Sequence, residues 1–341
     1  MQQSGRRRFA VPFLVSALIA GATCAWHAGS GGWAEAAGSL DGAPTAEALP
    51  AYSIAVLAPR EISVAATAEH PAYTVYTPGG PDIANASPVT LMVMHGMGGN
   101  GPGIAASILP FARAQGWTVV APTVPYGDWR DPSQLVGEEL GLQPQLAKLL
   151  DAIPAETGVT IGPQVMLFGF SRGAQAALRF TLLYPERVQA VAACSAGTYT
   201  IPAKSVLSEA GLTIAAPLPY GIADIEQRAG RDVQANTMAG VRFLISVGAK
   251  DNREADVPRQ WDQFLGKTRV ERAERFAALL AQFGLPARAV VVPDTGHELS
   301  GPMMEQVNAF LTAAAVDAQA QFNAGTTTFP APPRPTRQGR V

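Results

Sequence analysis

Short apolar runs alternate with amphipathic stretches along most of this chain of 341 residues. Continuous apolar runs are typical of strands buried on both faces of a sheet, whereas apolar positions three and four residues apart predict helices. The runs predict strands at 72–76, 89–94, 117–121, 165–168, 188–193, 241–247 and 287–292, with 72–76 at an edge of the sheet. The amphipathic stretches predict helices at 104–115, 136–153, 172–184 and 270–283, and a last helix that includes Leu311. This alternation predicts an α/β protein with a mostly parallel central sheet and helices on both faces.

One interval interrupts the alternation. About 45 residues separate Cys194 from Val241, and a connection of that length within a compact domain is usually functional. We interpret 195–240 as a lid-like insertion whose apolar stretch LTIAAPLPYGI, at 212–222, covers the substrate pocket. The alternative is a loop that packs against the side of the sheet.

The two ends of the chain differ in composition from the middle. Three arginines at 6–8 precede an apolar segment at 9–22, and Ala34-Glu35-Ala36 then resembles a cleavage site. This order predicts an export signal, of the twin-arginine or the general type, and a periplasmic or extracellular protein without stable membrane association after signal removal. A membrane anchor is the alternative for the same segment. The predicted boundaries are 1–37 for the signal, 38–322 for one catalytic domain and 323–341 for a Pro-rich disordered tail.

The overall composition is that of a folded protein without a strong charge. Hydrophobic residues make up 48% of the chain and charged residues 15%, and 25 basic against 27 acidic residues give a net charge of −2. Because positive and negative charges nearly cancel, the protein has no electrostatic field that would attract nucleic acid. Of the two cysteines, Cys24 lies in the predicted signal and Cys194 ends an apolar run. We therefore expect Cys194 to be a buried thiol, no intramolecular disulfide after export, and no metal site.

A single serine stands between two glycines where a predicted strand gives way to a predicted helix. The sequence is Gly169-Phe170-Ser171-Arg172-Gly173, and this Gly-x-Ser-x-Gly spacing between strand and helix is that of a nucleophile elbow. In such an elbow the serine adopts a strained backbone that projects its hydroxyl above the sheet. The helix N-terminus beside it provides backbone N–H groups and a partial positive charge. Ser171 is therefore the candidate nucleophile.

A serine hydroxyl needs a general base, which a third group must orient. The four histidines are His27, His70, His95 and His297. His27 lies in the predicted signal, and we expect His70, which precedes a proline ahead of an edge strand, to be a surface residue. His297 follows the last predicted strand in a loop, and open α/β sheets place their chemistry in loops at the carboxyl ends of strands. We predict His297 as the base.

Three aspartates compete as the group that orients this histidine. Asp251 comes just after the strand 241–247, which places it at the carboxyl end of a strand. Asp256 lies further on, and Asp294 precedes His297 too closely to reach the far side of the imidazole easily. We favour Asp251, with the other two as alternatives.

The loop HGMGGNG, at 95–101, follows the apolar run 89–94. We predict that the backbone N–H groups of Met97 and Arg172 form an oxyanion hole and that His95 has a structural role in the loop.

The same loop contains G-x-G-x-x-G, the pattern of a dinucleotide site, but no acidic residue ends the next predicted strand to bind a ribose. A dinucleotide-binding oxidoreductase is therefore an alternative, although the acidic residue that usually binds the ribose is missing.

These motifs resemble those of secreted α/β-hydrolases of the esterase and polyester (polyhydroxyalkanoate) depolymerase type. The resemblance covers roughly 70–315 and follows that family's order of nucleophile, acid and histidine; the matching residues are His95-Gly96, Gly169 to Gly173, Asp251 and Gly296-His297. The block GKTRVERAERFAALLAQFG followed by VVVPDTGHEL also resembles the helix–strand–histidine block of the family. The chain departs from the secreted polyester hydrolases in lacking a stapling disulfide.

The resemblance implies an α/β-hydrolase fold and hydrolysis of small or polymeric carboxylic esters through an acyl-enzyme, without a cofactor. A serine peptidase or amidase would use the same triad and is one alternative. A binding protein without catalysis on the same fold is another.

Overall fold

The structure is a computed structural model, and it describes residues 56–81, 89–207, 211–285 and 287–323. The strands are β1 (Val56–Leu57), β2 (Glu61–Val64), β3 (Ala72–Tyr76), β4 (Gly80–Pro81), β5 (Thr90–Met94), β6 (Thr118–Thr123), β7 (Val165–Phe170), β8 (Val188–Cys194), β9 (Ser205–Leu207), β10 (Thr213–Ala215), β11 (Arg242–Gly248) and β12 (Ala287–Val292). The α-helices are α1 (Gly101–Ala106), α2 (Leu109–Ala114), α3 (Pro132–Thr157), α4 (Arg172–Leu183), α5 (Ile225–Ala229), α6 (Asp262–Leu265), α7 (Arg269–Gln282) and α8 (Gly301–Asn323). Short 3-10 helices are η1 (Pro185–Arg187), η2 (Ala235–Met238), η3 (Glu254–Asp256) and η4 (Arg259–Trp261).

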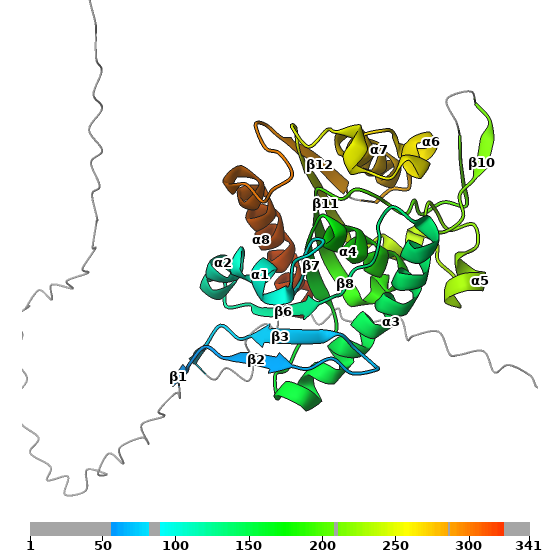
Figure 1. Cartoon of the computed structure of the whole chain (residues 1–341). Helices are drawn as coiled ribbons and strands as arrows, with labels where there is room; N and C mark the ends of the chain where they lie inside the picture. The colour runs from blue at the N-terminus through cyan, green and yellow to red at the C-terminus, as the bar shows by residue number, and fades with distance from the viewer. Residues whose placement is uncertain (1–55, 82–88, 208–210, 286, 324–341) are drawn as a thin grey trace, which may run out of the picture. The chain divides into compact units, whose positions relative to one another are not determined.

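One large sheet carries the fold, and its described strands lie in the order β12-β11-β8-β7-β5-β6-β3-β2 (Figure 1). The strands from β12 to β6 in that order run parallel, and β3 is antiparallel to both β6 and β2. This mostly parallel sheet confirms the predicted fold class. The expectation that 72–76 lies at the edge is wrong, because β2 pairs outside β3. β2 is short and carries alternating exposed side chains, which a search for apolar runs does not reveal.

Alternate residues of the central strands pack against two layers of helices. On β5, Met92 and Met94 belong to the core formed with α3, α4 and α7, whereas Leu91 and Val93 belong to the core formed with α1, α2 and α8. Figure 1 shows α1, α2 and α8 on one side of the sheet and α3 and α4 on the other. Burial on both faces is what makes these strands continuous apolar runs.

Two short helices stand where the sequence predicts one at 104–115. α1 ends at Ala106, and α2 begins at Leu109 with Pro110 in its first turn, where the missing N–H of proline would have had no helical partner. α3 extends beyond the predicted 136–153, because Asp131 caps it by accepting from the backbone of its first turn.

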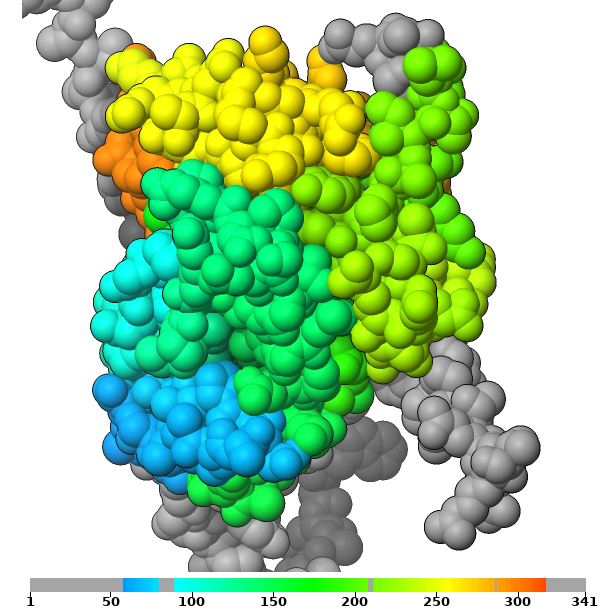
Figure 2. Space-filling view, turned by 45° about the vertical axis from the view of Figure 1, so that its right-hand side comes forward, coloured from blue at the N-terminus to red at the C-terminus, as the bar shows by residue number. Residues whose placement is uncertain are grey.

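The insertion at 195–240 contains the hairpin of β9 and β10, helix α5 and η2. Figure 2 shows this segment, in yellow-green, beside α3 and the yellow segment that contains α6. Leu218 is 7% exposed within the core that contains α3, α4 and α7. Tyr220 stacks on Phe264 with the ring centroids 4.7 Å apart. The second half of the apolar stretch, at 216–222, therefore packs against the side of the domain.

The predicted signal at 1–37 lies outside the described residues, as does the predicted tail apart from Asn323. Cys24 lies outside them too. Within the described part of the chain, no helix combines the length and the apolar content needed to cross a membrane.

Candidate active site

Ser171 occupies the sharp turn between β7 and α4. Its backbone angles are φ 55° and ψ −116°, which residues with a side chain rarely adopt. A Cβ on Gly173 would lie 2.0 Å from the Met94 carbonyl oxygen, and a Cβ on Gly169 would lie 2.6 Å from the Gly173 carbonyl oxygen. The two glycines therefore let α4 approach β5 and β7 closely while the serine between them is held at the end of the sheet.

His297 lies between Ser171 and Asp251. Its Nε2 is 2.9 Å from Ser171 Oγ, and its Nδ1 is 2.7 Å from Asp251 Oδ2. Because an ionised carboxylate only accepts, Nδ1 carries the proton and Nε2 accepts from the serine hydroxyl. The three residues follow β7, β11 and β12, whose carboxyl ends meet at one edge of the sheet. The structure thus brings the three predicted residues together in the order that the sequence predicts.

Asp251 is almost fully buried and has a second charged partner. Its carboxylate is 1% exposed, and Arg269 Nη1 donates to Oδ1 over 2.7 Å. Burial acts to raise the pKa of Asp251, but the hydrogen bond with His297 and the charge of Arg269 outweigh it, so the pKa lies below its ordinary value. Asp251 is therefore ionised at neutral pH.

The two rival aspartates lie elsewhere in the described structure. Asp294 pairs with Lys250 at 3.0 Å, and its side chain is 89% exposed. Asp256 lies in η3 and lines the pocket described below. Of the three candidates, Asp251 is the one placed against His297.

His95 fastens the loop that follows β5. Its Nε2 accepts from the Val124 backbone N–H over 2.9 Å, so its proton is on Nδ1, which lies 2.7 Å from the Gly96 carbonyl oxygen. Burial lowers the pKa of His95 more than that Gly96 contact raises it, which favours the neutral ring. A Cβ on Gly96 would lie 3.2 Å from Ser171 Cβ, so the loop runs directly beside the nucleophile. His95 therefore has the structural position that the sequence predicts.

Met97 and Arg172, whose backbone N–H groups are predicted to form the oxyanion hole, both line the pocket that contains Ser171. The Arg172 side chain is buried and pairs with Glu138 and, at 2.5 Å, with Glu139. Arg179 pairs with the same Glu139 carboxylate at 3.0 Å. Burial acts to raise the pKa of Glu139, but the two arginines lower it below its ordinary value. This buried network holds the first turn of α4, and with it the Arg172 N–H.

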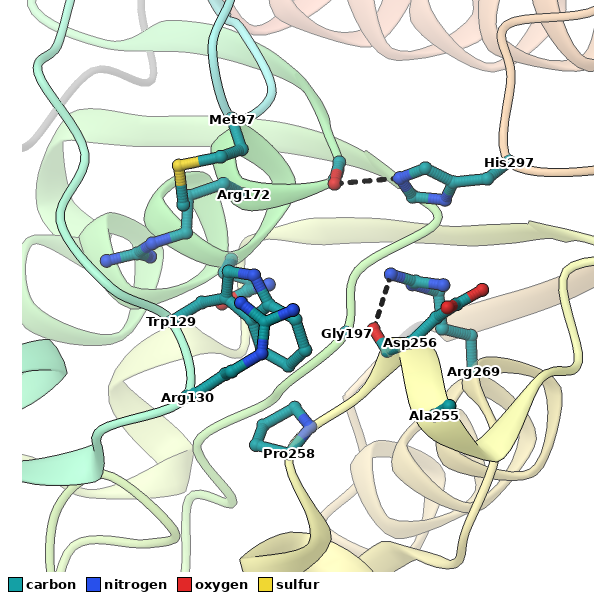
Figure 3. Close-up of a pocket in the computed structure, with 12 residues that line it drawn as sticks. Met97, Trp129, Arg130, Arg172, Gly197, Ala255, Asp256, Pro258, Arg269 and His297 are labelled. Atoms are coloured by element: carbon teal, nitrogen blue, oxygen red, sulfur yellow. Dashed lines mark hydrogen bonds between the residues drawn. The ribbon is translucent and has the colours of Figure 1, made fainter.

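A pocket of about 250 Å³ opens beside Ser171 and His297. Its lining residues are Met97, Trp129, Arg130, Ser171, Arg172, Gln175, Gly197, Ala255, Asp256, Pro258, Arg269 and His297. Figure 3 shows Met97 and Trp129 on one side of the pocket and Ala255 and Asp256 on the other. The loop before α3 and the segment around η3 therefore form much of its wall.

The predicted cover of the pocket by 212–222 is wrong in this structure. Among the described residues of the insertion, the pocket is lined by Gly197, while Leu218 and Tyr220 pack in the core and on α6. The part of the stretch at 216–222 is buried against the flank of the domain, whereas Leu212 is 68% exposed.

Several lining residues are not indicated by the sequence alone. Gln175 could have been found, because a residue four positions after Ser171 lies on the same face of a helix. Trp129, Arg130 and Arg269 lie in segments without a motif, and only the packing of the elements brings them to the pocket.

Cys194 and His70 are both buried. Burial raises the pKa of the Cys194 thiol to about 12, as suits the predicted inert thiol. The expectation that His70 is a surface residue is wrong: its ring lies 3.1 Å from Glu156 Oε1 and 3.0 Å from the Pro71 carbonyl oxygen. In the described part of the chain, no three His, Cys, Asp or Glu side chains come together as a metal site would require.

No protein-family model matches the chain, and no curated protein matches it in sequence. Solved structures match it in fold. The poly(aspartic acid) hydrolase-1 from Sphingomonas sp. KT-1 is 21% identical, with a TM-score of 0.54 over 75% of this chain and 98% of that one. A poly(3-hydroxybutyrate) depolymerase from Bordetella parapertussis is 22% identical, with a TM-score of 0.52 over 77% of this chain and 94% of that one.

The chain has the α/β-hydrolase fold. In an α/β-hydrolase, the nucleophile lies on a strand-to-helix turn at the top of the sheet, and the triad follows the chain order serine, acid, histidine. Ser171, Asp251 and His297 have that order, and Ser171 has that turn.

Proposed function

We propose that this α/β-hydrolase is a serine hydrolase that cleaves carboxylic esters through an acyl-enzyme. The observation that carries the proposal is the hydrogen-bonded series of Ser171, His297 and Asp251, at 2.9 and 2.7 Å. These lengths are within the reach that proton transfer between nucleophile and base requires. The strained serine and the pocket beside it support the same function.

In the first half of the proposed reaction, Ser171 Oγ attacks the ester carbonyl carbon and His297 Nε2 takes the hydroxyl proton. The carbonyl oxygen becomes an anion that accepts from the N–H groups of Met97 and Arg172. Asp251 stabilises the imidazolium that forms. The bond to the alcohol oxygen then breaks, the alcohol leaves with the proton from His297, and the acyl group stays on Ser171.

In the second half, a water molecule attacks the acyl carbon while His297 Nε2 takes one of its protons. The bond to Ser171 Oγ breaks, the carboxylic acid leaves, and the proton returns to the serine oxygen. The same side chains thus serve both halves, with His297 acting first as base and then as acid each time.

A fluorophosphonate and a series of nitrophenyl esters test the proposal. We expect the phosphonate on Ser171 by peptide mapping, and a fall in kcat of about 10⁶-fold in Ser171→Ala with an unchanged fold. Phosphonate on another serine, or none at all, would contradict it. A matched ester and amide distinguish ester hydrolysis from the peptidase or amidase alternative, which requires cleavage of the amide as well.

We also infer that the chain is exported and that the mature protein begins near Gly38 without a lipid. The basic residues at 6–8, the apolar segment at 9–22 and Ala34-Glu35-Ala36 support this inference. Mass spectrometry of protein recovered outside the cytoplasm tests it. An N-terminus at Cys24 carrying a diacylglycerol would contradict it.

A further inference from the structure

Gln175 brings the NH2 end of its side-chain amide to the pocket beside the nucleophile. It lies one turn along α4 from Ser171, is 6% exposed and lines the pocket. Its Oε1 accepts from the Thr198 hydroxyl over 2.7 Å. Its Nε2 makes no hydrogen bond with any residue that the structure describes. The Nε2 group is not closed off from solvent, so its N–H groups are available to an acceptor in the pocket.

Thr198 determines which end of this amide faces the pocket. Thr198 Oγ1 accepts from Arg179 Nη2 over 2.8 Å. Because a guanidinium only donates, the threonine proton remains available for Gln175, and its partner there must be an oxygen. The amide oxygen therefore faces Thr198, and the NH2 end faces the pocket.

Gly197 leaves space for a ligand atom beside this NH2 group. A Cβ on Gly197 would make only ordinary van der Waals contacts, 3.4 Å from Gln175 Nε2 and 3.6 Å from Val257 Cγ1, so one atom fits there without a clash. The same point lies 3.7 Å from Arg269 Nε, but that nitrogen is fully buried, so Gln175 is the donor that a ligand can reach here. The NH2 group of Gln175 and the backbone of Gly197 thus lie side by side in the pocket lining, and we call this position the donor corner.

The arginines around the pocket do not add net positive charge to the donor corner. Each one that lines the pocket has a carboxylate partner: the pairs are Arg269–Asp251, Arg172–Glu138, Arg172–Glu139 and Arg130–Asp128. The carboxylate of Asp256 also lines the pocket. A site with donors but no excess positive charge favours an uncharged acceptor over a carboxylate, because burying a further anion there would lack a free counter-charge.

We propose that the donor corner of Gln175 and Gly197 binds an uncharged carbonyl or hydroxyl oxygen in the acyl group of the substrate. The inference rests on the proposed ester hydrolysis and specifies its substrate class. The preferred esters are those of acids with a second oxygen function a few bonds from the ester carbonyl. Plain fatty-acid esters leave the donors of the corner unpaired and are poorer substrates.

Three methyl esters with acyl chains of matched length test the donor corner. Methyl 4-oxopentanoate carries a ketone where methyl pentanoate carries a CH2 group, and monomethyl succinate carries a carboxylate there. Acid release by the full chain is followed in a pH-stat, and each rate is divided by the alkaline hydrolysis rate of the same ester. We expect kcat/KM for the oxo ester to exceed the other two by about threefold to tenfold, the effect of one neutral hydrogen bond.

Two variants of Gln175 distinguish the effect of losing the hydrogen-bond donor from the effect of a damaged fold. Gln175→Met removes the amide at nearly constant length, and Gln175→Glu removes the N–H donors but keeps an oxygen for Thr198. In both we expect the ratio of oxo ester to pentanoate ester to fall to about one, since the hydrogen bond is gone. Gln145→Met, on α3 and outside the pocket lining, is the matched control and should keep the native ratio. If Gln175→Met fails to fold, the ratio in Gln175→Glu and the ratio in the native protein still test the donor corner.

A native ratio near one, a ratio that neither Gln175 variant changes, or a highest rate on monomethyl succinate would each overturn the donor corner. The esters are still hydrolysed in all three cases. Failure of the proposed ester hydrolysis is distinguishable, because then none of the three esters is turned over and Ser171 takes no phosphonate.

Discussion

Arg269 donates to the carboxylate of Asp251 over 2.7 Å from the first residue of α7. His297 contacts the other oxygen of the same carboxylate, so the proposed triad acid is held from two sides. Arg269 Nη2 also donates to the Asp256 carbonyl over 2.8 Å, which ties η3 to α7. One guanidinium thus keeps Asp251 ionised and positions part of the pocket wall.

Asp251→Asn should slow turnover by about 10⁴-fold, the effect of the same change in a serine protease triad. An amide presents an N–H group where His297 needs an acceptor, so the wrong tautomer of the imidazole is favoured. Asp256→Asn and Asp294→Asn are the controls and should lose little activity. Steady-state rates on a nitrophenyl ester measure all three. A severe loss in Asp294→Asn beside a mild one in Asp251→Asn would contradict the assignment.

Arg269→Met should lower the free energy of unfolding by about 3 kcal/mol at pH 7, because it removes one partner of a buried carboxylate. The folded-state pKa of Asp251 is lowered, so this stabilisation is present above the unfolded pKa, about 3.9. It is lost as the pH falls through the lower folded value. The difference between native protein and variant should therefore shrink below about pH 4. Urea unfolding at several pH values measures it.

Arg269→Lys is the matched control for that measurement. It keeps the positive charge beside Asp251 but not the planar group that also reaches the Asp256 carbonyl, so its loss should be smaller. A difference in Arg269→Met that stays constant with pH would indicate lost packing instead of lost charge.

Gly173→Ala should prevent the elbow from forming, since its Cβ would lie 2.0 Å from the Met94 carbonyl oxygen. We expect loss of hydrolysis together with a destabilised or unfolded protein. Gly141→Ala, on α3, is the control: a Cβ there meets nothing within 4 Å, and the change should stabilise the protein by about 0.4–1 kcal/mol. Thermal unfolding of the two variants measures the contrast. A stable, active Gly173→Ala would refute the close approach of α4 and β5.

Leu218→Ala should destabilise the protein by about 2–4 kcal/mol, because it opens a cavity in the core on the flank of the domain. The relative rates on short and long acyl esters should not change, since Leu218 does not line the pocket. Leu207→Ala is the control; Leu207 is 74% exposed, and its loss should be below about 0.5 kcal/mol. A changed preference for acyl chain length in Leu218→Ala, with unchanged stability, would instead support the predicted role of 212–222 as a lid over the pocket.

The central sheet could be predicted because helices cover both of its faces. β5, β7, β8 and β11 are therefore mostly apolar, whereas β2 carries exposed residues and leaves no such signal. The triad could be predicted for a related reason. Each of its residues directly follows a predicted strand, and parallel strands bring their carboxyl ends to one edge.

Contacts between separate elements could not be predicted in this way. Arg269 reaches Asp251 through the packing of α7 on the sheet, and a charged residue on a helix has no local feature that distinguishes it from a surface residue. The burial of His70 could not be predicted for a similar reason, because its partner Glu156 lies at the far end of α3 in the sequence. The apolar content of 212–222 predicts burial, but it does not specify the partner.

Cys194 closes β8 directly behind the nucleophile. None of its surface is exposed, and its backbone carbonyl accepts from the Ser171 N–H over 2.8 Å. It would be the sole cysteine of the mature protein, since Cys24 lies in the predicted signal. A thiol reagent can reach it only when β8 separates from its neighbours, so the labelling rate measures how often the sheet opens at the elbow. An inhibitor bound covalently to Ser171 should slow that labelling, which turns a residue without a chemical role into a reporter of occupancy at the nucleophile.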